Sequence, residues 1–297
     1  MTIQDQTGAS SAGRPSEGPD WWRENGPVAG RCPNCGTPDP RAFCPNCGQR
    51  QTDRRLSLRT LLRELPSRFF TLERGLPRTF IDMFRSPGKV AFDYVCGARK
   101  RYASPLTYFF VAATVQIVAL TLLKDVMLDS IRGQLGPQFE NPNNPLGQFI
   151  GRLGENSLER FAGIFYQVTR SAYSYLWILF SAAVALAFRL MPFAGKRRFN
   201  LAEHYVFALF TISHMILVSG LLAPFAIRWL GVATWGFIVW GIYFGFLGWA
   251  AIGFYRGRWY TVFCGLFALG AAFFVYVIVF WTAVLVIVAR SIQPAAG

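Results

Sequence analysis

Long apolar segments separated by short charged ones dominate the chain after residue 104. A helix needs about 20 apolar residues to cross a hydrocarbon core about 30 Å thick, because backbone polar groups there must pair within the protein. Ser104 followed by Pro105 is typical of a helix start. We therefore predict a mainly α-helical integral membrane bundle of about five spans, at residues 105–123, 172–191, 201–227, 229–254 and 261–289. A four-span bundle with one of the last three segments re-entrant stays open, because the joint at Arg228 is very short.

Composition and charge agree with a membrane protein and orient it. The chain is 53% hydrophobic and only 15% charged, which is unusual for a soluble protein. If the N-terminus lies inside, the inner segments carry 23 Lys and Arg and the outer segments carry 7. The positive-inside rule then places the N-terminus in the cytoplasm, and five spans leave the C-terminus outside.

Four cysteines form two copies of the segment Cys-Pro-Asn-Cys-Gly within residues 31–50: Cys32, Cys35, Cys44 and Cys47. In a reducing cytoplasm, paired C-x-x-C segments favour metal ligands over disulfides. Four thiolates complete a tetrahedral shell, which suits structural Zn²⁺ and leaves no coordination position open for catalysis. Iron in a rubredoxin-like site uses similar turns and remains an alternative, but the short segment between the pairs favours zinc.

The predicted zinc ribbon is too small to fold alone, so metal binding would supply its folding free energy. Residues 37–43, between the two pairs, contain one Arg and one Asp, which argues against nucleic-acid binding. The net charge of +14 is largely explained by positive charge that faces the membrane. We expect the ribbon to dock a cytoplasmic protein or to stabilise the membrane domain.

Residues 54–103 interleave leucine and phenylalanine with arginine at helical spacing, as at Leu58 and Leu61 beside Arg59. Short amphipathic helices of this kind can lie at the interface on anionic lipid, or they can pack against the inner face of the bundle. The sequence does not decide between these two interpretations. The pair Pro87-Gly88 is expected to end a helix. A basic run is expected to anchor the first span at the lipid headgroups: Arg99, Lys100 and Arg101.

The third predicted span contains the ionisable residues that are candidates for an intramembrane polar site: Glu203, His204 and His214. On a helix, Glu203 and His214 share a face but lie about 16 Å apart along the axis, so they cannot bind one metal ion together. Ionisable groups at such depth are costly and often functional, which supports a polar path for a proton or a substrate. The structural alternatives are a salt bridge from Glu203 to the basic residues 196–198 and a neutral His214 hydrogen-bonded to a neighbouring helix.

Three glycines of the fourth predicted span share one helical face: Gly241, Gly245 and Gly248. Small residues on one face allow another helix to approach closely, so this face could form a homo-oligomer. The sequence contains no phosphate-binding loop, nucleophile elbow or zinc-protease motif. It therefore favours a protein that is not an enzyme, without excluding one.

The order of several short segments resembles a family of bacterial multi-spanning membrane proteins catalogued as a domain of unknown function. The segments are the paired cysteines ending in Gln49, then Arg-Leu-Ser-Leu-Arg-Thr-Leu at 55–61, Arg-Thr-Phe at 78–80, Arg-Ser-Pro-Gly at 85–88, and Asp93 to Tyr102 followed by Pro105-Leu106. The resemblance is strong over about residues 30–125, and Glu203-His204-x-x-Phe207 is its clearest later part. It implies a cytoplasmic ribbon and an integral domain of the bacterial inner membrane, and it implies no activity.

These inferences divide the chain into four parts. Residues 1–30 are polar, lack the apolar core of a cleavable signal, and are expected to be a disordered tail. A zinc ribbon at 31–50, amphipathic helices at 54–103 and a membrane domain at 104–290 follow, with an outer loop at about 124–171. We expect a non-enzymatic scaffold or partner-docking protein. The alternative is a small transporter or a membrane-embedded enzyme that uses a polar path around His214 and Glu203.

Overall fold

The structure is a computed structural model that describes residues 30–38, 41–51, 56–63, 75–139, 141, 143–152, 156–190, 199–255 and 260–292. Almost all of the predicted N-terminal tail lies outside these residues. The described part is helical apart from turns and two isolated β-bridges, so the predicted mainly α fold is confirmed. Its helices are α2 (Leu58–Arg63), α4 (Gly75–Arg85), α5 (Pro87–Val95), α6 (Pro105–Leu122), α7 (Lys124–Phe139), α8 (Pro145–Gly151), α9 (Ser157–Leu190), α10 (Leu201–Leu230), α11 (Val232–Tyr255) and α12 (Tyr260–Ile292).

Four helices of the described residues are long and apolar enough to cross a membrane: α6, α10, α11 and residues Gly265–Arg290 of α12. The predicted span at 172–191 falls in α9, which has 34 residues and is therefore about 51 Å long. The apolar segment found in α9, Leu176–Leu190, is shorter than a full span. The bundle is thus a membrane domain with at least four spans, and the fifth stays a prediction.

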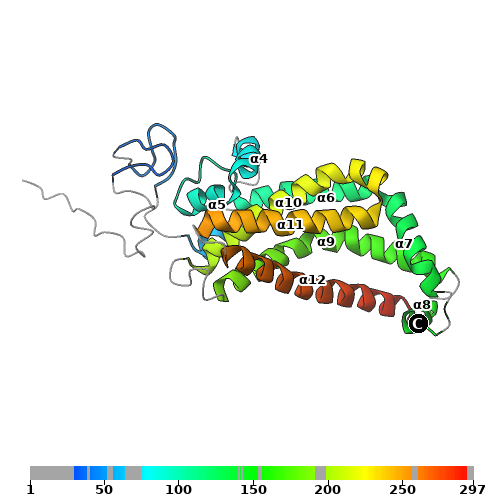
Figure 1. Ribbon diagram of the computed structural model, residues 1–297. Coiled ribbons are helices and arrows are strands. Elements are labelled where there is room, and N and C mark those ends of the chain that lie inside the picture. The colour runs from blue at the N-terminus through cyan, green and yellow to red at the C-terminus, as the bar shows by residue number, and fades with distance from the viewer. Residues whose placement is uncertain are drawn as a thin grey trace, which may run out of the picture.

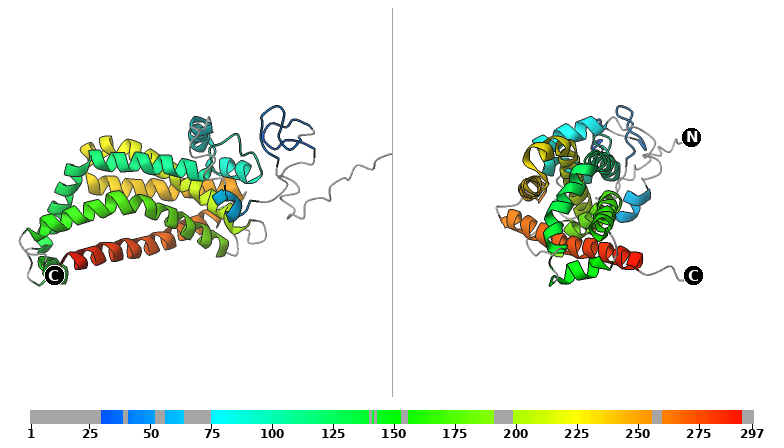
Figure 2. Two further views of the ribbon diagram at one scale, coloured as in Figure 1. Left: turned by 180° about the vertical axis from the view of Figure 1, so that it is seen from behind. Right: turned by 90° about the vertical axis from the view of Figure 1, so that its right-hand side faces the viewer.

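The long helices α6, α9, α10, α11 and α12 lie side by side and alternate in direction (Figures 1 and 2). The segment with the four cysteines, residues 30–51, lies beyond α5 at one end of this bundle, which we call the cysteine end. Helix α7 and the last turn of α12 lie at the opposite end, which we call the α7 end. Because α9 also runs the length of the bundle, the chain passes between the two ends five times.

Helix α10 is the central helix of the bundle. In its most apolar window 78% of the residues are buried, against 28% in the window of α12, and it packs on α5, α6, α9 and α11. The buried polar residues of this helix are Glu203, His204, Thr211, Ser213, His214 and Ser219. The polar side chains that the sequence singled out therefore lie in the most enclosed part of the fold.

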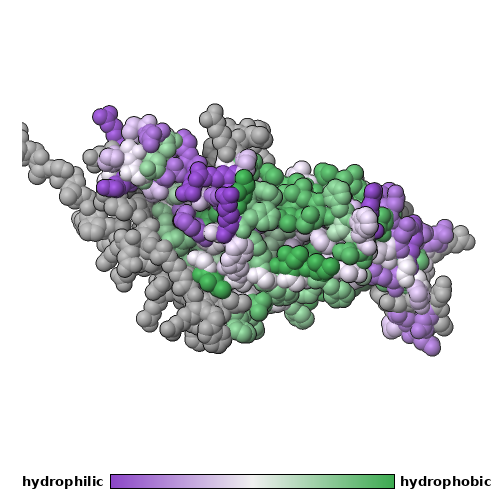
Figure 3. Space-filling view, turned by 45° about the horizontal axis from the view of Figure 1, so that its top comes forward, coloured by the Kyte–Doolittle hydropathy of each residue, from purple (hydrophilic) through white to green (hydrophobic). Residues whose placement is uncertain are grey.

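On the face that Figure 3 shows, apolar side chains form a band over the middle of the bundle, and hydrophilic ones gather at both ends. Large apolar side chains of α10 and α11 are largely exposed, including Phe225 at 72%, Trp229 at 86% and Phe237 at 82%. Exposed apolar surface of this extent is stable against lipid and not against water. The band is the surface expected of a membrane-spanning bundle.

Helix α5 packs against the bundle, with seven of its nine residues buried. Its Gly88 lies directly on α11, where an added Cβ would lie 2.6 Å from the carbonyl carbon of Gly253 and closer still to the carbonyl oxygen of Ala250. Of the two interpretations of residues 54–103, packing against the bundle therefore holds for α5. Helix α4 ends at Arg85, directly before Pro87-Gly88, as the sequence predicted; the structure adds that Pro87 also begins α5, where the missing N–H costs nothing.

The stretch expected as an outer loop, residues 124–171, is helical over most of its described length, in α7, α8 and the first part of α9. Its helices are held together by packing and by an ion pair that sequence polarity does not reveal. Arg132 of α7 donates from Nε and Nη2 to the two carboxylate oxygens of Glu159 in α9, each at 2.7 Å. This bidentate pair lowers the pKa of Glu159, chiefly through the hydrogen bonds from Arg132.

Candidate metal centre and buried polar residues

The four predicted cysteine ligands lie together at the cysteine end of the bundle. Their Sγ atoms all lie within 4.8 Å of one another, with Cys32 and Cys47 3.6 Å apart and Cys35 and Cys44 3.5 Å apart. Disulfide sulfurs would be about 2.05 Å apart, whereas four thiolates about 2.3 Å from one zinc ion form a tetrahedron with edges of about 3.8 Å. The four side chains therefore fit one tetrahedral metal ion and leave it no open position.

Each cysteine pair is carried on the same tight turn. The N–H of Gly36 donates to the carbonyl of Cys32 at 2.8 Å, and the N–H of Gly48 donates to the carbonyl of Cys44 at 2.7 Å. The two glycines have φ values of 77° and 66°, which glycine adopts without steric cost. The repeated Cys-Pro-Asn-Cys-Gly segment thus encodes two equivalent turns that bring four sulfurs to one point.

The local hydrogen bonds prepare some of these thiols for metal binding. The hydroxyl of Thr37, 3.1 Å from the sulfur, lowers the pKa of Cys35 to about 6. A backbone hydrogen bond from Cys47 lowers the pKa of Cys44, while burial raises the pKa of Cys47 to about 11. Metals bind thiolates, so Cys47 must release its proton when an ion binds, and metal affinity falls as the pH falls.

Gln49 joins the cysteine segment to the membrane bundle. Its side chain is 7% exposed, and its Nε2 donates to the carbonyl of Gly97 at 2.8 Å. Its Oε1 accepts from the backbone N–H groups of Arg99 and Lys100, each at 3.1 Å. These three hydrogen bonds fix the cysteine segment to the turn just before α6. In the sequence, Gln49 is simply the residue that follows the second Cys-Pro-Asn-Cys-Gly segment. No neighbouring residue indicates that its side chain binds the turn before α6.

A polar cavity of about 430 Å³ lies at this junction. Its described lining combines residues of the cysteine segment with the turn before α6 and the start of α4: Asn34, Cys35, Cys47, Gly75, Arg78, Lys100 and Arg101. The carboxylate Asp82 lies 3.5 Å from Arg78 and 3.9 Å from Arg101. Among the described residues, these three cationic side chains have one close carboxylate, which leaves this part of the junction positively charged.

The basic run predicted to anchor the first span is divided between different environments. Arg99 is only 7% exposed, Lys100 is exposed, and the side chain of Arg101 is 36% exposed with its guanidinium 5.4 Å from the ring centre of Tyr102. Lys100 and Arg101 line the junction cavity, and Arg99 supplies a backbone N–H to Gln49. A contact between this run and the lipid headgroups stays a prediction. Arg99, the most buried of the three residues, is the least accessible to a headgroup.

Glu203 closes the N-terminus of α10. The side chain of Asn200 accepts from the N–H of Glu203 at 3.0 Å, and the carboxylate of Glu203 accepts from the N–H of Asn200 at 2.7 Å. This reciprocal pair is a capping box. Glu203, which is 0% exposed, therefore has a structural role at the start of α10. The sequence signal was Asn-x-x-Glu at the start of an apolar run. Residues 196–198, the expected salt-bridge partners, lie outside the described residues.

His214 and His204 each bind a tyrosine of another helix. The Nδ1 atom of His214 lies 2.7 Å from the hydroxyl of Tyr108 in α6, and the Nδ1 atom of His204 lies 2.7 Å from the hydroxyl of Tyr255 in α11. Four aromatic rings surround His214 with centres 4.5–6.2 Å away: Phe80, Phe84, Tyr108 and Phe246. The structure therefore does not bring Glu203, His204 and His214 into one site. Each lies in its own buried contact.

The three glycines of α11 do not share one environment. Gly241 and Gly245 are exposed, and a Cβ added at either position would have no neighbour within 4 Å. Gly248 is buried, and its Cα lies 3.9 Å from the position of a Cβ added to Gly265 in α12. Gly248 thus serves packing within the chain, while an oligomer through Gly241 and Gly245 stays a prediction.

The fold and the cysteine cluster define an α-helical membrane protein with four cysteines at one end of its bundle that are placed to hold a metal ion. Residues 73–117 match the family described as Protein of unknown function (DUF3667). The matched stretch contains α4, α5 and most of α6, and it includes the turn that binds Gln49. No curated protein and no solved structure matches the chain. The match supports the predicted resemblance over this stretch, and it does not indicate any activity.

Proposed function

We propose that this protein is a non-enzymatic membrane protein whose zinc ribbon docks an acidic segment of a cytoplasmic partner. The observation that supports it is the junction cavity, where Arg78, Lys100 and Arg101 meet the metal cluster. Complementary charge speeds association and selects partners, and an acidic side chain would compensate the surplus positive charge. The three hydrogen bonds of Gln49 support the same proposal, because they hold the ribbon at a defined position for a partner to bind.

Zinc is the metal that the chemistry of the cluster favours. Four thiolates form a closed tetrahedral shell, which is typical of structural zinc sites, and the two turns lie close together in the chain. The cytoplasmic location rests on the positive-inside rule and on the reduced state that such thiols require. Metal analysis of the purified protein tests the identity of the bound ion directly.

Photocrosslinking in native membranes tests the docking proposal. Phe43 is 61% exposed on the cysteine segment, so a photoreactive phenylalanine at position 43 preserves the fold and faces solvent. We expect a discrete adduct with another protein. We expect Lys100→Glu to reduce the yield of that adduct severalfold, because it places a negative charge in the cavity.

Two matched variants control this experiment. The same photoreactive residue at Phe225, an apolar side chain of α10 that is 72% exposed, should give no protein adduct, and Lys124→Glu at the α7 end should leave the adduct from position 43 unchanged. Adducts from position 43 that form only with lipid or with this chain would overturn the proposal. Equal yields in the Lys100 and Lys124 variants would also overturn it.

The alternative function, a small transporter or membrane-embedded enzyme, draws its support from the Nε2 atom of His214. This atom is buried and has no hydrogen-bond partner among the described residues. The cavity beside it has a volume of about 70 Å³ and an almost entirely apolar lining, which includes Phe84, Met215 and Phe246. This volume lies far below the range of about 300–1,000 Å³ that is usual for small-molecule sites, so the cavity is too small for a substrate. We therefore favour the docking function.

A further inference from the structure

Helix α4 exposes an apolar stripe next to a cationic one. The side of the helix around Met83 is buried, whereas Ile81 is 47% exposed, Phe84 is 48% exposed, and Arg78 and Arg85 are exposed. Successive residues of an α-helix are turned by about 100°, so Phe84 and Ile81 come first on going round the helix from Met83. Arg85 and Arg78 come next. This order of buried, exposed apolar and cationic faces is typical of a helix that lies in a membrane interface.

Two contacts place α4 beside the start of the first span. The backbone N–H of Ala103, two residues before α6, donates to the hydroxyl of Thr79 at 2.8 Å. The ring centre of Phe84 lies 4.5 Å from that of His214, which is hydrogen-bonded to Tyr108 in the first turn of α6. These contacts hold α4 level with the first turn of α6, at the cysteine end of the bundle (Figure 1).

The start of α6 lies close to the lipid headgroups. This helix is long and apolar enough to cross a membrane, and its 18 residues rise about 27 Å. The hydrocarbon core of a bilayer is about 30 Å thick, so α6 needs its whole length to cross it. Helix α4, which lies level with the first turn of α6, is therefore at the boundary between the headgroups and the acyl chains.

The apolar stripe of α4 is continuous with the lipid-facing surface of the spans. Phe84 lines the cavity of about 70 Å³ beside His214 together with Leu222 of α10 and Ile242 of α11. Leu222 and Ile242 are 48% and 50% exposed, and both belong to helices that can cross a membrane. Because exposed apolar side chains of such helices face lipid, the same lipid layer extends over Phe84.

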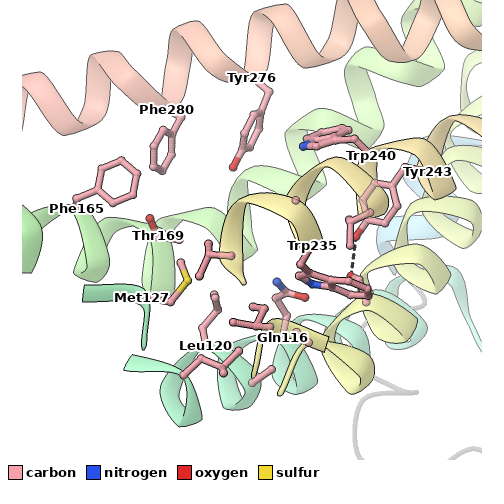
Figure 4. A pocket seen from close by; sticks show the side chains of 18 of the residues that line it. Gln116, Leu120, Met127, Phe165, Thr169, Trp235, Trp240, Tyr243, Tyr276 and Phe280 are labelled. Carbon is pink, nitrogen blue, oxygen red and sulfur yellow. Dashed lines mark hydrogen bonds between the residues drawn. The ribbon is translucent and has the colours of Figure 1, made fainter. Parts of the chain in front are cut away.

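A larger cavity, of about 350 Å³, is a separate feature in the half of the bundle nearer α7 (Figure 4). Helices α6, α7, α9, α10, α11 and α12 contribute to its lining, and none of its described lining residues is Lys, Arg, Asp or Glu. No described residue of α4 belongs to this lining. The exposed stripe of α4 therefore lies on the outer surface and is not part of this internal cavity.

Arg85 provides positive charge beside the apolar stripe. It is exposed, and no carboxylate of the described residues forms an ion pair with it, whereas Arg78 lies 3.5 Å from Asp82. A guanidinium has several N–H donors and binds phosphate oxygens well. Basic side chains next to a span are attracted by anionic lipids. The charge of Arg85 therefore favours a negatively charged headgroup.

We propose that α4 is an interfacial helix that binds an anionic phospholipid of the leaflet at the cysteine end. Ile81 and Phe84 contact the acyl chains, and the guanidinium of Arg85 binds the headgroup phosphate. The described lining of the junction cavity includes Arg78 but neither Ile81, Phe84 nor Arg85. The lipid site is thus a different surface from the junction cavity, and it does not depend on the docking function.

Photocrosslinking to lipid tests the proposal. The purified full chain with a photoreactive phenylalanine at position 84 is placed in nanodiscs that contain equal amounts of phosphatidylglycerol and phosphatidylcholine with the same acyl chains. We expect lipid adducts, identified by mass, in which phosphatidylglycerol exceeds phosphatidylcholine about threefold or more. Arg85→Gln should lower this ratio about twofold or more, because it removes the cation next to the stripe. The matched control is Arg152→Gln, an exposed arginine at the α7 end, which should leave the ratio unchanged.

Three further probe positions complete the test. The photoreactive residue at Ile81 should give the same lipid adducts as at Phe84, without replacing the ring that contacts His214. At Phe225 of α10 it should also give lipid adducts, and at Phe43 of the cysteine segment it should give none. Adducts from position 225 but from neither 81 nor 84 would overturn the proposal, as would equal lipid yields from positions 43 and 84. Equal amounts of the two lipids in the wild-type adducts, or an unchanged ratio in Arg85→Gln, would overturn the assignment of an anionic headgroup.

Discussion

Substitution of Gln49 by alanine should release the cysteine segment from the bundle. The substitution removes three hydrogen bonds at a side chain that is 7% exposed, and it leaves the carbonyl of Gly97 and the N–H of Lys100 without this partner. At about 0.5–1.5 kcal/mol for each net hydrogen bond, the docking of the segment loses about 2–4 kcal/mol. Because 1.4 kcal/mol is a factor of ten, the opening equilibrium should shift about 30-fold or more.

Hydrogen exchange followed by mass spectrometry measures this shift. The peptide that contains the backbone N–H of Lys100 should exchange about 30-fold faster or more in Gln49→Ala than in the wild-type chain. The matched control is Gln134→Ala, which truncates an exposed glutamine that donates to Ser130 in α7. It should leave exchange at the cysteine end unchanged. Exchange at Lys100 that is the same in wild type and in Gln49→Ala would refute the argument that Gln49 holds the segment in place.

Three further changes test the metal centre, the helix packing and the ion pair. Cys44→Ser should lose the bound metal, measured as metal per chain, whereas Cys96→Ser should keep it; equal metal content would exclude the four-cysteine site. Gly88→Ala should destabilise the chain by about 1–3 kcal/mol in thermal unfolding, because its Cβ overlaps α11, and Gly241→Ala, which points into open space, should change stability by less than about 0.5 kcal/mol. Similar midpoints for these two variants would contradict the close helix contact. Glu159→Gln should lower the unfolding midpoint at pH 7, because a lowered pKa stabilises the fold while the carboxylate is ionised. The difference from wild type should shrink once the pH falls below the ordinary glutamate pKa of about 4, and it should disappear only below the lowered pKa of the folded chain. A difference that persists in acid would assign the effect to packing.

The cysteine cluster was predictable because its information is local. Each pair of cysteines and its glycine lies within five consecutive residues, so the turn geometry follows from the segment itself. The spans were predictable for a related reason, since a membrane requires about 20 apolar residues in one continuous segment. The capping box at Asn200 and Glu203 was also local, and the pattern Asn-x-x-Glu could have identified it before any ion pair was considered.

The contacts that decide function depend on residues far apart in the chain. His214 was predicted either to lie on a polar path or to bind a neighbouring helix, and only its 2.7 Å contact with Tyr108, 106 residues away, supports the second interpretation. Gln49 is hydrogen-bonded to the turn before α6, which lies about 50 residues later in the chain. No periodicity in the sequence predicts a contact between residues so far apart. The need for glycine at position 88 likewise comes from the backbone of α11.

The sequence by itself determined that this is a helical membrane protein with four cysteines spaced to hold one metal ion, because hydrophobic length and ligand spacing act within single segments. Only the tertiary structure decided how the cysteine segment is held, that Glu203 and the histidines lie in separate contacts, and that α6, α9, α10, α11 and α12 enclose a neutral cavity between them. Cavities and buried hydrogen bonds depend on which helix faces meet. Packing over the whole bundle determines which helix faces meet, and no single segment determines it.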